Sequence, residues 1–148
     1  MMKGINILTL IFATLFLFGC KQEFEDISSS EKYGHLIGNK YVSIKLLRIH
    51  EITMDSNYQK IVDHYTLTKQ PGMGGPEVIS SADVQVGRGI KIKKVLQCSN
   101  CFLGAPIAIV VDLDNDGLKE KIPVLLYGLR FEGPDGKVSL DPEFFKSL

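Results

Sequence analysis

Apolar side chains recur along most of the chain in the short, alternating runs that are typical of strands. In 61–68, for example, Val62, His64 and Thr66 would lie on one face and Tyr65 and Leu67 on the other. Two later segments, 107–113 and 122–129, are the most apolar of the predicted strands. The predicted strands are 41–52, 61–68, 84–86, 90–97, 107–113 and 122–129.

Clusters of Gly, Pro, Asn and Asp separate these segments and predict turns. They are Asp55-Ser56-Asn57, the Gly/Pro loop 71–76, Gly87-Arg88-Gly89 (a bulge or tight bend) and 114–117. At the end of the chain, Asp141-Pro142-Glu143 has the cap, the first-position proline and the acid that favour a helix start. The pattern therefore predicts an all-β fold: a small antiparallel β-barrel or sandwich with a short C-terminal helix.

The first twenty residues follow a different pattern. Lys3 precedes an apolar stretch, 5–18, which is shorter than the roughly 20 residues that a spanning helix needs. The stretch ends in Leu17-Phe18-Gly19-Cys20, which resembles the cleavage box of bacterial lipoproteins, although Phe18 is larger than the residue usual at that position. The alternatives are a secretory signal with an incidental cysteine and an uncleaved short anchor.

The lipoprotein resemblance implies a signal peptide at 1–19 and fatty-acyl chains of the palmitate class on Cys20, the first residue of the mature chain. These chains would hold the protein in the cell envelope. Lys21 follows the cysteine where the family's inner-membrane signal has Asp, so we expect an outer-membrane anchor, with the domain in the periplasm or on the cell surface. Residues 20–32 are polar and predict a flexible tether, and 33–148 a single β-rich domain.

Composition narrows the possible partners. Without its signal the chain has 129 residues, enough for one domain with a modest core. All 17 acidic residues remain and Lys3 is lost, which leaves 16 basic residues and a net charge of −1. Because there is no basic excess, we expect no nucleic-acid partner.

Cys98 and Cys101 are the cysteines left after acylation, and the envelope favours disulfides. A four-residue turn brings its end Cα atoms within about 7 Å, close to the roughly 4.4–6.8 Å that a disulfide needs. A structural disulfide is the favoured interpretation. A redox pair is the alternative, although such pairs usually begin a helix. A zinc site would need a second ligand pair, which the sequence lacks.

The segment 112–120 has acids where a calcium loop has ligands. Asp112, Asp114, Asp116 and Glu120 occupy positions 1, 3, 5 and 9 and Gly117 position 6, which resembles the first part of an EF-hand loop. Position 12 would be Pro123 instead of Glu. We therefore expect at most weak, millimolar calcium binding and no other cofactor. A hairpin turn between two apolar strands is the favoured interpretation.

No catalytic motif stands out. The Gly/Pro loop lacks the Lys of a phosphate loop, and no nucleophile elbow occurs. The sequence favours a membrane-anchored lipoprotein whose β-domain binds an envelope or host protein partner, or a ligand, without catalysis. The alternative is a thiol-disulfide redox protein that uses Cys98 and Cys101.

Overall fold

The computed structural model describes residues 23–55, 57–101, 104–114, 117–119 and 121–148. This part of the chain is all-β, as predicted, with a single 3₁₀ turn, η1 (Gly34–Leu36). Its strands are β1 (Phe24–Asp26), β2 (Lys40–Ser43), β3 (Leu47–Ile52), β4 (His64–Lys69), β5 (Val78–Val84), β6 (Gly89–Cys98), β7 (Ile107–Leu113), β8 (Val124–Leu126), β9 (Arg130–Glu132), β10 (Val138–Leu140) and β11 (Phe145–Ser147).

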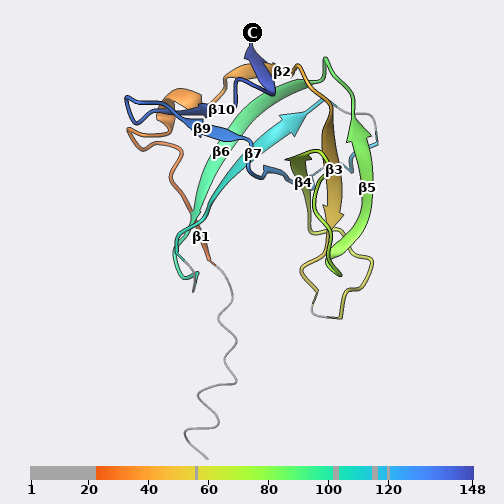
Figure 1. The fold of residues 1–148 in the computed structure, drawn as a ribbon. Coiled ribbons are helices and arrows are strands. Elements are labelled where there is room, and N and C mark those ends of the chain that lie inside the picture. Colours follow the sequence, from red (N-terminus) through yellow and green to blue (C-terminus); the bar gives the residue numbers. More distant parts are fainter. Residues whose placement is uncertain (1–22, 56, 102–103, 115–116, 120) are drawn as a thin grey trace, which may run out of the picture.

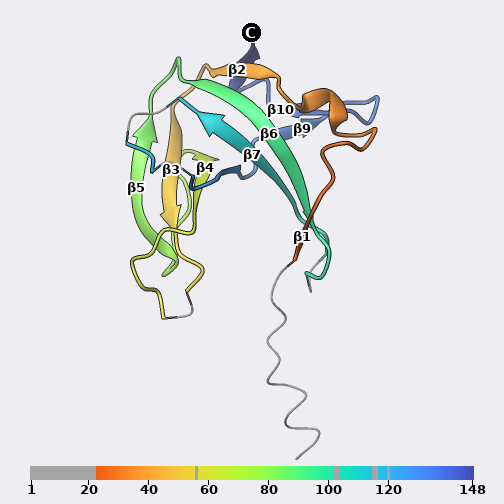
Figure 2. The same cartoon turned by 180° about the vertical axis from the view of Figure 1, so that it is seen from behind.

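Nine strands form one curved sheet (Figure 1). Eight of them follow the order β11-β2-β6-β7-β8-β4-β3-β5, and the ninth, β1, lies off this path. The long strand β6 also pairs with β1 near its C-terminal end. All pairs are antiparallel except β4 with β8, which is parallel. The end strands β11 and β5 do not pair with each other, so the sheet is not closed into a barrel, and the predicted barrel is wrong in this respect. Figure 2 shows the same open arrangement from behind.

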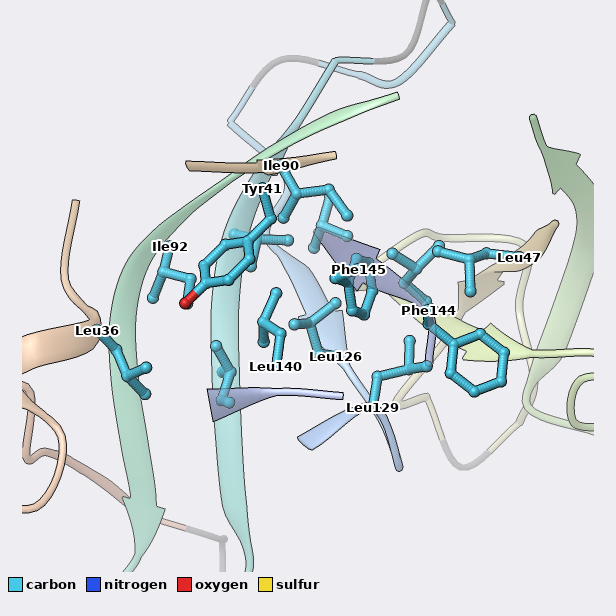
Figure 3. Packing of buried hydrophobic residues seen from close by; sticks show 14 of the residues in the cluster. Leu36, Tyr41, Leu47, Ile90, Ile92, Leu126, Leu129, Leu140, Phe144 and Phe145 are labelled. Carbon is cyan, nitrogen blue, oxygen red and sulfur yellow. The ribbon is translucent and has the colours of Figure 1, made fainter. Parts of the chain in front are cut away.

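The hydrophobic core lies against the curved sheet and is completed by short elements outside it. The hairpin of β9 and β10 contributes Val138 and Leu140, and η1 contributes Leu36. Burial of one such aliphatic side chain stabilises a fold by about 1.5–3 kcal/mol. Figure 3 shows the central residues of this cluster, which include Leu36, Tyr41, Leu47, Ile90, Ile92, Leu126, Leu129, Leu140, Phe144 and Phe145.

The predicted C-terminal helix is wrong. Asp141 does start a turn: its side chain accepts the Glu143 N–H at 3.0 Å, and its carbonyl accepts the N–H groups of Phe144 and Phe145. The chain then leaves the turn and pairs with β2 as β11. So short a helix is marginal by itself, whereas strand pairing satisfies the backbone and buries both Phe side chains.

Most of the apolar segments became strands with shifted bounds, but of the predicted strand 84–86 only Val84 lies in a strand, β5. The prediction for 107–113 is confirmed by β7, and β8 pairs with it antiparallel. The segment 41–52 is instead divided into β2 and β3 by a bend. Within 23–32, predicted as part of a tether, residues 24–26 form β1 and lie in the sheet.

Candidate functional site

The cysteine pair lies at the C-terminal end of β6. Cys98 is the last residue of that strand, the Cα atoms of Cys98 and Cys101 are 5.7 Å apart, and their sulfur atoms are within bonding distance. Cys98 is buried and Cys101 is half-buried. The next element is strand β7, and not the helix that typically follows a redox pair. This arrangement suits a structural disulfide that clips a turn.

The disulfide turn also holds the start of the described chain. The Ser99 N–H donates to the Glu23 carbonyl at 3.0 Å, and the Glu23 N–H donates to Asn100 Oδ1 at 2.7 Å. In the pairing of β1 with β6, Phe24 lies opposite Cys98. The turn is therefore the point at which the N-terminal segment joins the sheet.

Further bonds fix the residues that follow β1. The Ile27 N–H donates to the Val95 carbonyl at 2.9 Å, and the Val95 N–H donates to Ser28 Oγ, also at 2.9 Å. Asp26 Oδ1 accepts the Ser28 N–H, and hydrogen bonds from Ser28 lower the pKa of the Asp26 carboxyl. The sequence did not predict this attachment because the segment is polar. The only sequence signals were Phe24 and Ile27.

The calcium candidates lie only in part within the described residues. Asp112, at the end of β7, forms an exposed ion pair with Lys93 at 3.1 Å, and the Asp114 N–H donates to the Gly89 carbonyl. Asp116 and Glu120 lie outside the described residues. Among the residues that are described, no three His, Cys, Asp or Glu side chains converge on a possible metal site.

The Gly/Pro loop lies within the connection 70–77, here called the strap, which crosses the outer face of β3. In the strand register, Lys69 lies opposite Leu47 at one end of β3, while Val78 lies opposite Ile52 at the other end. The strap therefore connects β4 to β5 by running along β3, the strand that lies between them. It covers His50, whose side chain is only 1% exposed.

Each ring nitrogen of His50 has a hydrogen-bond partner. The Met73 N–H donates to Nε2 at 3.3 Å, and Nδ1 lies 2.7 Å from Ser81 Oγ. Thr68 Oγ1 lies 3.1 Å from Nε2. Burial, and secondarily the charge of Arg48, lowers the pKa of His50. The buried, neutral ring fastens the strap and offers no accessible base.

The sequence pattern indicated the Gly/Pro loop but gave no role to His50. Gly72 connects the two: its φ is +98°, and a Cβ at this position would lie 2.7 Å from His50 Cε1 and Nε2. The glycine therefore allows the strap to approach the ring. A histidine within an alternating strand was the only signal in the sequence, and it does not specify a partner 23 residues away.

Comparison with known proteins found no matching family model, no matching curated protein and no matching solved structure. Within the described ranges, no helix has both the length and the apolar character to cross a membrane. The predicted signal peptide, 1–19, and Cys20 lie outside those ranges. The features that bear on function are thus the N-terminal sequence, the disulfide turn and the surface of the β-domain.

Proposed function

We propose that this chain is an envelope lipoprotein, anchored by fatty-acyl chains on Cys20, whose β-domain binds a partner without catalysis. The main support for this proposal is the sequence Leu17-Phe18-Gly19-Cys20, which ends an apolar stretch that follows Lys3. A basic start and an apolar stretch of this length are typical of a signal peptide. The residues before Cys20 resemble the lipoprotein cleavage box.

The anchor would need nothing from the β-domain itself. Each methylene buried in the bilayer contributes about 0.8 kcal/mol, and two or more acyl chains anchor a protein stably where one does so only marginally. Lys21 after the acylated residue favours the outer membrane in a bacterium that has two membranes. The domain would then lie in the periplasm or on the cell surface.

A binding role is favoured because three side chains that could carry chemistry, Cys98, Cys101 and His50, are engaged in the structure of the domain. Cys98 and Cys101 are paired next to buried strands. His50 is enclosed by the strap and hydrogen-bonded on both nitrogens. Small β-domains commonly present loops and sheet edges to a partner. An envelope or host protein is the proposed class of partner.

Replacement of Cys20 tests the anchor. In the native host, Cys20→Ser should abolish labelling by a fatty-acid analogue, and the protein should leave the membrane fraction. Cys98→Ser with Cys101→Ser is the matched control: it removes two cysteines outside the cleavage box and should leave labelling unchanged. A Cys20→Ser protein that is still labelled and still sediments with membranes would show that the proposal is wrong.

A further inference from the structure

The disulfide turn limits how far the domain can stand from the anchor. Glu23 is held by hydrogen bonds to Ser99 and Asn100. Only three residue steps separate it from Cys20. Since an extended chain spans at most about 3.6 Å per residue, Glu23 lies within roughly 11 Å of the acylated residue. This end of the domain must therefore lie next to the lipid headgroups if Cys20 is acylated.

The same end of the molecule carries a second feature. In Figures 1 and 2, the connection between β3 and β4 reaches the lower end of the domain, as does the turn that follows β6, while the C-terminus lies at the upper end. Three apolar side chains of this connection are largely exposed. Met54 is 64% exposed, Tyr58 53% and Ile61 57%.

The backbone of this connection is fixed by its own acids. Asp63 Oδ2 accepts the Met54 N–H at 2.6 Å. Asp55 Oδ1 accepts the Asn57 N–H at 2.6 Å, and the Asp55 carbonyl accepts the Tyr58 N–H at 2.9 Å. These bonds engage both carboxylates and leave the three apolar side chains at the surface, where packing within the domain does not cover them.

We propose that Met54, Tyr58 and Ile61 insert into the headgroup region of the membrane that holds Cys20. This inference rests on the proposed function. Tyr is enriched at membrane–water interfaces because its ring is apolar and its hydroxyl polar. Lys60, two residues after Tyr58, is exposed, and its positive charge suits lipid phosphates. Because Glu23 lies within roughly 11 Å of Cys20, about the diameter of one helix, a folded protein would not fit between Glu23 and the membrane.

The test uses the full, acylated chain reconstituted into phosphatidylcholine vesicles. A polarity-sensitive fluorophore is attached at Tyr58→Cys or, for a position without the positive φ of Tyr58, at Ile61→Cys. Val86→Cys is the matched control: Val86 is 58% exposed and belongs to the connection between β5 and β6, and this connection lies at the opposite end in Figure 1. The paired Cys98 and Cys101 and the acylated Cys20 would not react with the label.

We expect the probes at 58 and 61 to shift to shorter wavelength and to lose most of their emission when the lipids carry a headgroup-level quencher. The probe at 86 should show neither change. Intact mass is measured first. If the chain is acylated and all probes respond alike, the inference is wrong and the proposed anchor stands. If the chain is not acylated, both are wrong.

Discussion

Gly72 decides how closely the strap approaches β3. An added Cβ would lie 2.7 Å from the His50 ring and 2.9 Å from Arg48 Cδ, at a φ of +98° that L-residues rarely adopt. Gly72→Ala should therefore lower the free energy of unfolding by about 1–3 kcal/mol. Urea denaturation of the purified variant measures this change.

The neighbouring glycine provides the control for this measurement. At Gly74 nothing lies within 4 Å of an added Cβ, and φ lies outside the left-handed region. Gly74→Ala should leave the free energy of unfolding within about 0.5 kcal/mol of the parent. Equal losses in the two variants would contradict the described position of the strap over His50.

His50 should make the stability of the domain depend on pH. Burial lowers its pKa in the folded state below the usual value of about 6.5. The unfolded chain therefore binds the proton first as the pH falls, and the free energy of unfolding decreases below about pH 6.5. Above that pH His50 is neutral in both states, and its contribution to the free energy of unfolding is fully present. His64, whose pKa burial also lowers, should add to the same trend.

Denaturation at pH 7.5 and pH 5.5 tests this dependence. His50→Gln lowers stability at both values, so the difference between them is the readout. That difference should be smaller in His50→Gln than in the parent, and His64→Gln should reduce it separately. A difference that His50→Gln leaves unchanged would mean that His50 is not the buried neutral group described above.

At the scale of elements, apolar patterning predicted strands better than it predicted their bounds and faces. The run 107–113 became β7, a strand between β6 and β8 in which Ile109 and Val111 are buried. In 41–52 the alternating residues Val42, Ile44 and Leu46 are half-buried or exposed, while Tyr41 and Leu47 are buried. The buried residues Tyr41, Ser43, Leu47 and Ile49 keep one alternation across the bend between β2 and β3. No Gly or Pro marks this bend in the sequence.

Elements that depend on a distant partner were not predictable from local sequence. Strand β1 exists because β6 and the disulfide turn bond to it, although its own residues are mostly acidic. The segment after Asp141 has a helix-start sequence, yet pairing with β2 determines its form. The strap was predicted as a loop, but its contact with His50 depends on how β3 lies between β4 and β5.

The disulfide turn should stabilise the domain without contributing chemistry. In a chain-entropy estimate, so short a loop contributes about 2 kcal/mol. Cys98→Ser with Cys101→Ser should therefore still fold but melt at a lower temperature, since a domain of this size is held by roughly 5–15 kcal/mol. The melting temperature by circular dichroism measures the effect.

Thiol labelling of the native protein, without reductant, is the companion measurement. We expect no reaction at Cys98 or Cys101 before unfolding. Free thiols in the envelope protein, or a pair that cycles while it reduces a substrate disulfide, would contradict the structural role. Either result would favour the alternative, a thiol-disulfide redox protein.

At the scale of the whole molecule, the sequence predicted the all-β class but not the arrangement. Short strands and turns are compatible with a barrel, a sandwich or an open sheet. Two features of the sheet arise from contacts between segments far apart in the chain. These are the parallel pairing of β4 with β8 and the position of β11 and β5 at its two ends, where they do not pair with each other. Local alternation indicates that a strand has two different faces, but not which strand lies beside it.

The attachment of Glu23 to the disulfide turn gives the whole molecule an orientation relative to the proposed anchor. The lower end in Figure 1 would face the lipid, and the upper end, where the C-terminus lies, would be free for a partner. This orientation depends on Cys20 being the acylated first residue of the mature chain.

The most direct test is the intact mass of the mature chain extracted from its own membrane. The account predicts a polypeptide that begins at Cys20 and has lost residues 1–19. It also predicts added mass of at least two fatty-acyl chains, all on the N-terminal peptide. A chain that begins at another residue, or that begins at Cys20 with no lipid, would contradict the account.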